Sequence, residues 1–368
     1  MKVCLLYPHF FGHDGYVRDI NTLHVELSRS AKHQIFVCPP SAATGIDGRP
    51  GIDELKLIKP LMEILPEVDL VHIFGFFFPL YPLLITLIQM YNKPYILSPL
   101  SQLEKLALKV SHSKKCIFIN TFGRHMLKKA AVIHAFSSSE AQSIKAITEK
   151  APVMQASLGI YYEDIPPVIR PSRLRPMNDY FLFFGRLAYF HKGVDVLLDG
   201  YARYLARGGN TDLVIAGKSW AGSHEQIRLR IDELKLSSRL HFLGETSLDE
   251  KFSLIQECKA FIYPSRYDGP PRPVRDALAL HKPLLVSFQA NIISNIERCG
   301  WGYAFNPVPE ELSDAMRRMD MEYNGDNYQD PQTTLSWGAV AAQYDGIYDS
   351  LAIYGPPACL LDEYAIKI

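Results

Sequence analysis

Short apolar runs alternate with stretches of helical periodicity along almost the whole chain. In the first half, the runs that predict buried strands are residues 3–7, 34–38, 70–74, 95–98 and 132–136, with helical patterns such as 18–30 and 82–90 between them. Apolar strands joined by helices are typical of a parallel sheet that is covered on both faces. The first half therefore predicts a doubly wound α/β domain.

The pattern lapses at residues 160–179, a stretch with four prolines and mixed charges that predicts a linker. It then resumes with strands at 180–184, 212–216, 240–243, 260–263 and 284–288 and helices at 194–207, 225–236, 247–258 and 273–280. The stretch TTLSWGAVAAQYDGIYDSL near the end predicts a terminal helix. We expect Rossmann-like domains over 1–159 and 160–335, followed by a C-terminal helix and tail over 336–368. Such domains bind ligands outside the carboxyl ends of their strands.

One segment resembles a membrane span. Residues 73–91 contain no charge over nineteen positions, close to the ~20 that a helix needs to cross a bilayer. Gly75, Pro79 and Pro82 interrupt the run, which favours a strand end, a turn and a buried helix. The first residues, MKVCLLYPHFFGHDG, favour a first buried strand over a signal peptide.

The composition is that of an ordinary globular protein, with 48% hydrophobic and 21% charged residues. Lysine plus arginine equals aspartate plus glutamate at 39 each, so the overall charge gives no reason to expect nucleic acid or another polyanion as partner. The six cysteines are far apart and have no metal-ligand spacing. They indicate reduced thiols and a cytoplasmic protein.

The segment FLFFGRLAYFHKGVDVLLDGY, residues 181–201, places two cations between a strand and a helix. Arg186 and Lys192 follow the strand that ends at Gly185, and the helix begins near Val194. A guanidinium fork, an ammonium and a helix N-terminus together suit a diphosphate. The alternative is a pair of solvated loop cations.

The segment SRYDGPPRPVRDALAL, residues 265–280, contains two aspartates eight positions apart. We expect Asp276 in the first turn of a helix, where the dipole favours a carboxylate that can accept hydrogen bonds from vicinal hydroxyls. The alternative is that Asp276 serves only the helix N-terminus. Asp268 lies in the turn before that helix.

These segments, with DLVIAGKS, LHFLGETSLDEKFSLIQECKAFIYPSRYDG and RDALALHKPLLVS, follow one another as in the family-4, or group 1, retaining glycosyltransferases. The resemblance covers the chain, including DLVHIFG and IHAFSSSE, and is most specific in the second half. It implies the GT-B fold, in which two Rossmann-like domains face each other across a cleft and the C-terminal helix returns to the first domain. It also implies retaining hexosyl transfer from a nucleoside-diphosphate sugar, such as a UDP- or GDP-sugar, to a glycan or lipid-linked acceptor in cell-surface polysaccharide or glycolipid synthesis. We expect no cofactor. No metal is needed if Arg186 and Lys192 neutralise the diphosphate, and the sequence has no Asp-x-Asp metal pair.

The resemblance also implies site residues. The arginine and lysine that bind the donor diphosphate correspond to Arg186 and Lys192, and the family's two glutamates align with Asp268 and Asp276. We expect Arg186, Lys192 and Asp268 to be catalytic. The expected donor-binding residues are Gly185, Gly217, Gly244, Gly269, Arg272, Val274 and Asp276.

The sequence departs from the family at several of these positions. Each aspartate is shorter than glutamate by one C–C bond, about 1.5 Å. Pro270, Pro271 and Pro273 have no N–H, so backbone donors remain only at Gly269, Arg272, Val274 and Arg275. Arg272 is either a ligand contact that compensates or a solvent-facing arginine. His281 replaces the usual glycine at a helix end, which implies a different helix exit or a strained residue.

The first half departs further. Tyr16 replaces the second glycine of a Gly-Gly turn that begins at Gly15, and Leu100 and Ser101 replace a His-Gly pair. Our candidates for the acceptor side are Gly15, Tyr16, Ser101 and Glu140, although Glu140 is at least as well explained as a helix cap. His72 and His134 fit structural roles at strand ends. These departures leave a catalytically silent nucleotide-sugar-binding or scaffold protein as the alternative function.

Residues 105–129 are strongly basic. The segment has seven lysines or arginines, no acid and interleaved apolar residues. It is either a solvated helix face or a patch that gives the protein a peripheral contact with anionic lipid headgroups or a phosphorylated lipid acceptor. A third hypothesis for the function of the protein is an adaptor that binds a lipid surface and has no affinity for nucleotides.

Overall fold

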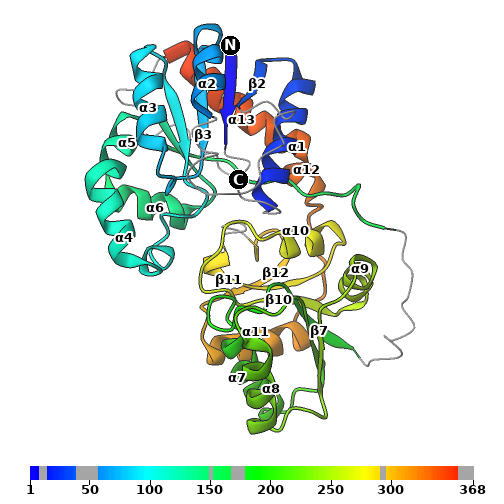
Figure 1. Cartoon of the computed structure of the whole chain (residues 1–368). Helices are drawn as coiled ribbons and strands as arrows, with labels where there is room; N and C mark the ends of the chain where they lie inside the picture. Colours follow the sequence, from blue (N-terminus) through cyan, green and yellow to red (C-terminus); the bar gives the residue numbers. More distant parts are fainter. Residues whose placement is uncertain (8–14, 39–56, 149–151, 167–178, 291–295, 355–368) are drawn as a thin grey trace. The chain divides into compact units, whose positions relative to one another are not determined.

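The computed structural model describes residues 1–7, 15–38, 57–148, 152–166, 179–290 and 296–354. The chain divides into two compact units (Figure 1). The first comprises Met1–Gly159 and the chain from Trp337 onward, and the second comprises Ile160–Ser336. Each unit has one parallel six-stranded sheet and its own hydrophobic core. The predicted α/β class with two doubly wound domains is confirmed.

The first unit has the strand order β2-β1-β3-β4-β5-β6. Its strands are β1 (Lys2–Leu6), β2 (Gln34–Cys38), β3 (Leu70–Phe74), β4 (Tyr95–Ser98), β5 (Val132–Ala135) and β6 (Val153–Gln155). Its helices are α1 (Gly15–Ser30), α2 (Ile58–Ile64), α3 (Tyr81–Met90), α4 (His112–Phe118), α5 (Arg124–Lys129), α6 (Ser138–Ile147) and α13 (Trp337–Tyr354), with a π-helical turn η5 (Ile119–Gly123) between α4 and α5. The second strand of this order, β1, pairs in parallel with β2 and β3, so that Val3 lies between Ile35 and Leu70.

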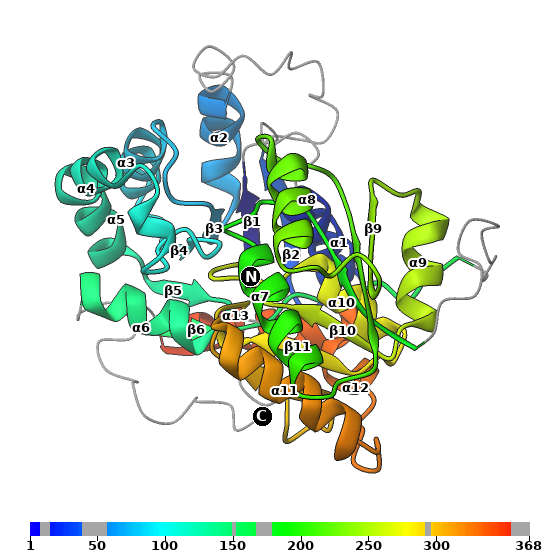
Figure 2. The ribbon, with the colours of Figure 1, turned by 90° about the horizontal axis from the view of Figure 1, so that it is seen from below.

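The second unit has the strand order β12-β11-β10-β7-β8-β9. Its strands are β7 (Tyr180–Phe184), β8 (Asp212–Ala216), β9 (Leu240–Gly244), β10 (Ala260–Tyr263), β11 (Leu284–Ser287) and β12 (Gly302–Phe305). Its helices are α7 (Val194–Ala206), α8 (Ser223–Glu233), α9 (Leu248–Glu257), α10 (Arg272–Ala279), α11 (Pro309–Met321) and α12 (Gln332–Leu335). Helix α11 packs along α7 (Figure 2).

The predicted strands all occur within a residue or two of their expected bounds. The sequence patterns missed β6 and β12, which have only three and four residues. The uncharged stretch 73–91 forms the end of β3, a turn and helix α3, as expected. In the part of the chain that the structure describes, no helix has the length and apolar character to cross a membrane.

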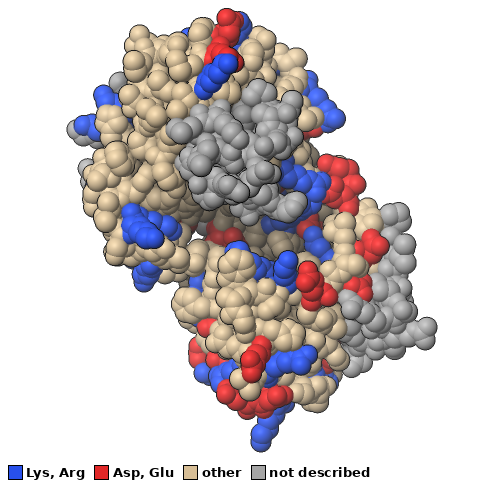
Figure 3. All heavy atoms as spheres, viewed as in Figure 1, with Lys and Arg blue, Asp and Glu red and all other residues tan. Residues whose placement is uncertain are grey.

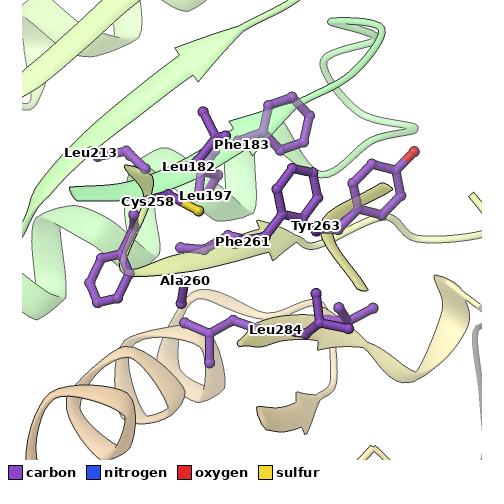
Figure 4. Close-up of a cluster of buried hydrophobic side chains, with 14 of the residues drawn as sticks. Leu182, Phe183, Leu197, Leu213, Cys258, Ala260, Phe261, Tyr263 and Leu284 are labelled. Carbon is purple, nitrogen blue, oxygen red and sulfur yellow. The ribbon is translucent and has the colours of Figure 1, made fainter. Parts of the chain in front are cut away.

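The core of the second unit lies between its sheet and helices. Leu182, Leu213 and Phe261 come from three neighbouring strands and are fully buried, and Leu197 of α7 packs with them (Figure 4). Tyr263 is at the edge of this cluster, with its hydroxyl pointing away from the other side chains (Figure 4). The apolar core therefore supports a polar group at the carboxyl end of β10.

Helix α13 packs against α1 in the first unit (Figure 1). A chain of buried polar side chains joins this helix to the sheet. Tyr348 lies 2.9 Å from Nδ1 of His72, and Nε2 of His72 lies 2.6 Å from Oγ of Ser98. Ser98 in turn lies 2.7 Å from Nδ1 of His134, whose Nε2 is 2.9 Å from the carbonyl of Ala156. Every donor meets an acceptor if both imidazoles carry their proton on Nε2.

Burial of these two histidines disfavours their charged forms. It lowers the pKa of His72 well below its usual range, with a further contribution from His134, and lowers the pKa of His134 to about 4. Both rings are therefore neutral members of a structural network, which is the role that the sequence favoured.

The chain leaves the first unit at Gly159 and re-enters it at Trp337. A Cβ on Gly159 would come within 2.4 Å of the Trp337 indole, so only glycine allows this contact. Immediately beyond the two crossing points, the Ile160 N–H donates to the Leu335 carbonyl at 2.8 Å. The two segments that connect the units are thus hydrogen-bonded to each other.

Candidate functional site

Three loops meet at the carboxyl ends of β7, β8 and β9 in the second unit. The Gly217 N–H donates to the Gly244 carbonyl at 2.7 Å, and a Cβ on Gly217 would lie 1.8 Å from the Gly185 carbonyl oxygen. Gly217 has φ +137°, a conformation that side chains rarely adopt. The three glycines expected at the donor site therefore lie together and allow the loops to pack closely.

Arg186 follows Gly185 and projects outward from this junction. The residue is exposed, and its guanidinium lies 4.6 Å from the ring centre of Trp220, which follows β8. Within the described ranges, no carboxylate forms an ion pair with Arg186. The site thus presents a cation whose hydrogen-bond donors are not engaged by an acid.

Lys192 is the second cation of the site, and its side chain lies on the side of β7 that faces β10. The residue is only 6% exposed, and its ammonium forms an ion pair with Asp268. Asp268 also accepts a hydrogen bond of 2.8 Å from the Tyr263 hydroxyl at the end of β10. The loop is held there by Gly193, where a Cβ would lie 2.0 Å from the Pro264 carbonyl oxygen. The structure therefore brings Lys192 and Asp268 together from positions 76 residues apart.

His191, beside Lys192, stacks on Tyr267 with a centroid distance of 4.0 Å and pairs through Nε2 with the Tyr267 carbonyl at 2.8 Å. Burial, followed by the charge of Lys192, lowers the pKa of His191 to about 4. This ring is therefore neutral at physiological pH and supports the loop without adding a charge.

Asp276 is not in the first turn of its helix, so that expectation is wrong. Helix α10 begins at Arg272 with Pro271 as its N-cap, which places Asp276 in the second turn. The residue is 1% exposed, and its carboxylate forms an ion pair with Lys251 of α9. Arg272 Nε lies 4.0 Å from the other carboxylate oxygen. Asp276 is therefore buried against two cations.

The proline-rich turn offers fewer backbone donors than expected. The N–H groups of Val274 and Arg275 donate to the Pro271 carbonyl at 3.1 and 3.2 Å, because the helix has already begun. Val274 is also fully buried. Its expected role as a backbone donor to a ligand is therefore wrong, and of the four proposed N–H groups those of Gly269 and Arg272 remain.

The guanidinium of Arg272 pairs with Asp164 at 2.9 Å and lies 5.1 Å from the ring centre of Tyr161. Arg272 is therefore partly buried and held in an ion pair, which argues against the alternative of a solvent-facing arginine. At the other end of α10, His281 has φ +54°, and the Lys282 N–H reaches back to the Ala277 carbonyl at 2.9 Å. The helix keeps a left-handed end without glycine, which confirms the strained residue.

The acceptor-side candidates lie in the first unit. Glu140 is fully buried; its carboxylate accepts the Ser101 N–H at 2.6 Å and the Phe136 N–H at 2.9 Å. Burial raises the pKa of Glu140 to about 8. Tyr16 stacks on Phe136 with a centroid distance of 6.2 Å. The structure thus brings Tyr16, Ser101 and Glu140 around Phe136, and Gly15 is the first residue of α1.

Leu100 and Ser101, which replace the family's His-Gly pair, have φ +57° and +60°. Two consecutive left-handed residues without glycine cost roughly 1–2 kcal/mol each. The carboxylate of Glu140 stabilises this turn through the Ser101 N–H. Glu140 therefore acts on the loop, and the Ser137 hydroxyl, not Glu140, caps α6.

Sequence reasoning did not identify Lys251 or Trp220. Lys251 follows the Ser247–Glu250 capping box of α9, and its position on the buried side of that helix became apparent only with the fold. Trp220 belongs to a short loop without helical or strand periodicity. Among the described residues, no group of three histidine, cysteine, aspartate or glutamate side chains has the arrangement of a metal site.

The chain is similar to known glycosyltransferases in both sequence and fold. Residues 165–324 match the family model described as glycosyl transferases group 1. A search of curated proteins finds no relative of this sequence. Solved structures, by contrast, align over nearly the whole length of the chain.

Sucrose-phosphate synthase from Thermosynechococcus elongatus is 16% identical over 96% of this chain and 99% of that chain, with a TM-score of 0.71. The lipopolysaccharide outer core galactosyltransferase WaaB is 18% identical over 95% and 99%, with a TM-score of 0.66. Anabaena HepE in complex with UDP-glucose is 14% identical over 95% and 100%, with a TM-score of 0.66. Residues 165–324 therefore resemble the group 1 glycosyltransferases in sequence, and the two units of the chain have the GT-B fold.

Proposed function

We propose that the protein transfers a hexosyl group from a nucleoside-diphosphate sugar to a hydroxyl acceptor, with retention of the anomeric configuration and without a metal ion. The observation that carries this proposal is the pair of cations at the end of β7. Arg186 is exposed and unpaired by any acid in the described chain, and Lys192, six residues later in the same connection between β7 and α7, is buried with one carboxylate partner. The family match supports the same reaction class.

The chemistry follows from charge. Cleavage of the sugar–phosphate bond leaves additional negative charge on the departing diphosphate. Preorganised cations stabilise that charge most effectively where water is limited, as at the buried Lys192. An ammonium has three donors, so Lys192 can hold Asp268 and a phosphate oxygen together. Asp268, fixed by Lys192 and Tyr263, then orients the donor sugar.

The donor is proposed to be a UDP- or GDP-sugar. Anabaena HepE, which has the same fold, was solved in complex with UDP and with UDP-glucose, and this supports a uridine nucleotide. The proposed acceptor is a glycan or lipid-linked hydroxyl in the synthesis of a cell-surface polysaccharide or glycolipid, on the cytoplasmic side of a membrane.

A thermal-shift screen of UDP, GDP, ADP and their sugars tests donor binding, because a specific ligand raises Tm by mass action. We expect Arg186→Ala and Lys192→Gln to abolish the shift. Arg317→Ala is the control, because Arg317 lines a separate hollow of 640 Å³ at the opposite, amino-terminal edge of the same sheet. If no nucleotide shifts Tm, the donor assignment fails.

Catalysis is tested separately by donor hydrolysis and by transfer to mixed glycan and lipid acceptors, with NMR of the product anomer. Retention is the expected result, and activity should persist in excess EDTA. Both aspartates are engaged in ion pairs, and that of Asp276 is buried; this observation favours the alternative, a silent nucleotide-sugar-binding protein. Tight donor binding without turnover, even with the native acceptor, would support that alternative.

We also propose that residues 105–129 form a peripheral contact with anionic lipid. The segment folds as α4, η5 and α5, and the apolar side chains of Val110, Ile117 and Phe122 are 51%, 64% and 50% exposed. Its cations lie among them in the sequence. By contrast, lysine and arginine are interspersed with acids on the part of the second unit that is visible in Figure 3. Apolar groups that insert beside cations are typical of interfacial binding.

Co-sedimentation with phosphatidylglycerol and phosphatidylcholine vesicles tests this contact. We expect binding to phosphatidylglycerol only, weakened by salt and lost in Ile117→Ser/Phe122→Ser. Met90→Ser, which removes a 72% exposed apolar residue from α3, should bind like the wild type. If both variants bind equally, or if the wild type does not bind, the lipid contact is rejected and residues 105–129 are a solvated helix face. Binding to vesicles by a protein without nucleotide affinity would favour the lipid adaptor.

A further inference from the structure

Trp220 differs from the other two tryptophans of the chain. Trp301 and Trp337 are 2% and 5% exposed and belong to the packed interior, whereas Trp220 is 54% exposed. The part of an aromatic surface that stays open to water adds little to the stability of the second unit. The residue lies in the loop after β8, at the same edge of the sheet as Arg186 and Lys192.

The backbone holds Trp220 in place. Ala221 and Gly222 have φ +49° and +75°, which makes a tight turn into α8. The Trp220 N–H donates to the Ser223 hydroxyl at 3.1 Å, and its carbonyl accepts the Ser223 N–H at 3.0 Å. On the other side, Ser219 forms a bridge with Leu187. A fixed aromatic ring loses little conformational freedom when a ligand stacks on it.

The position of Trp220 relative to the cations indicates what it binds. The guanidinium of Arg186 lies 4.6 Å from the centre of the indole ring. A diphosphate bound by Arg186 would therefore lie close to the ring. In the strand order β10-β7-β8-β9, Lys192 and Asp268 lie on the β10 side of β7, and Trp220 lies on the β8 side.

The two ends of a nucleoside-diphosphate sugar leave the diphosphate in different directions. If Asp268 orients the sugar on the β10 side, the nucleoside extends toward β8 and meets Trp220. The side chains of Trp220 and Arg186 have no hydrogen-bond acceptor with which to distinguish one base from another. The indole ring, however, has a face on which any base can stack.

We propose that Trp220 is the stacking platform for the nucleobase of the donor, adjoining the diphosphate cation Arg186. This inference rests on the proposed donor function. It makes Trp220 a residue that strengthens nucleotide binding without choosing the base by hydrogen bonds. Uridine and guanosine nucleotides should therefore both depend on it, whereas inorganic pyrophosphate, which has no base, should not.

Intrinsic fluorescence tests the proposal directly, because Trp220 is the exposed one of the three tryptophans. We expect UDP and GDP to quench the wild-type emission and pyrophosphate to quench it little. By calorimetry, Trp220→Ala should bind UDP about 5- to 150-fold more weakly, the effect of ~1–3 kcal/mol of base stacking. Pyrophosphate affinity should be unchanged in this variant. Trp220→Phe should restore most of the UDP affinity while removing the quench.

Phe288→Ala is the matched control, since Phe288 is 58% exposed and follows β11 rather than β8. It should bind UDP like the wild type. Unchanged UDP affinity in Trp220→Ala would overturn the inference and leave the donor function standing. Equal weakening of UDP and pyrophosphate would also overturn it, because Trp220 would then only position Arg186. No nucleotide binding by the wild type would overturn both.

Discussion

Replacing Lys251 by methionine removes the main counter-ion of a carboxylate that is almost completely buried. The side chains of Lys251 and Asp276 are 10% and 2% exposed, so solvent screens the pair little. Breaking such a pair from one side costs roughly 3–5 kcal/mol, because the remaining charge stays buried without compensation. Arg272, 4.0 Å from the carboxylate, offsets part of that cost. We therefore expect Lys251→Met to lose about 3 kcal/mol, a large part of the ~5–15 kcal/mol that stabilises a domain.

The double variant separates charge from packing. Methionine keeps an apolar stem beside Phe184 and Phe252, whose ring centres lie 5.7 and 4.7 Å from the lysine nitrogen. With both charges removed in Lys251→Met/Asp276→Leu, no uncompensated charge remains. We expect the double variant to be more stable than either Lys251→Met or Asp276→Asn.

Urea denaturation is the assay, followed by the emission of Trp301 in a Trp220→Phe/Trp337→Phe background. Trp301 belongs to the core of the second unit, so it reports on the unit that contains the ion pair. Arg203→Met is the control: the Arg203–Glu310 pair is 55% and 59% exposed, and its loss should change stability by less than about 1 kcal/mol. The reasoning is refuted if Lys251→Met unfolds like Arg203→Met, or if the double variant loses the sum of the two single effects.

Three further outcomes follow from the structure. Arg186→Ala should reduce kcat while leaving Tm without ligand within a degree or two of the wild type, since the exposed guanidinium holds no acid in the described chain; a large loss of Tm would make it structural. Because burial lowers the pKa of His134 from 6.5 to about 4, its neutral form stabilises the first unit fully above pH 6.5. About 3 kcal/mol of that stability is lost progressively as the pH falls from 6.5 to 4, so urea midpoints between pH 7.5 and 5 should show a decline that His134→Asn reduces. His281→Gly should raise the unfolding free energy by roughly 0.5–1 kcal/mol, and His281→Ala should not, because only glycine relieves φ +54° without strain.

The sequence predicted the two sheets well because their strands are buried on both faces and form continuous apolar runs, such as Phe181 to Phe183. It predicted that Lys192 and Asp268 lie at one site because strand ends at one edge of a parallel sheet lie together, and the two form an ion pair. The sequence could not predict which side chain pairs with Asp276. The partner of Asp276 is Lys251, 25 residues earlier in the chain on another helix, and only the packing of α9 against α10 makes them neighbours.

The local sequence pattern also could not predict the residue at which α10 begins. Proline suits the first turn of a helix, so the sequence RPVRDALA allows α10 to begin at Arg272 or at Pro273. That one position determines whether Asp276 belongs to the first turn. It likewise decides that the Val274 N–H is used inside the helix.

The return of the chain at Trp337 sets an order of events during synthesis. Helix α13 supplies the Tyr348 hydroxyl that His72 needs, yet it leaves the ribosome only after the whole of Ile160–Ser336. At ~5–20 residues per second, the first sheet waits on the order of ten seconds or more for that helix. The second unit, which is one continuous segment, can fold during that wait. A nascent chain arrested before α13 should therefore carry a protease-resistant second unit beside a first unit that is still open to chaperones.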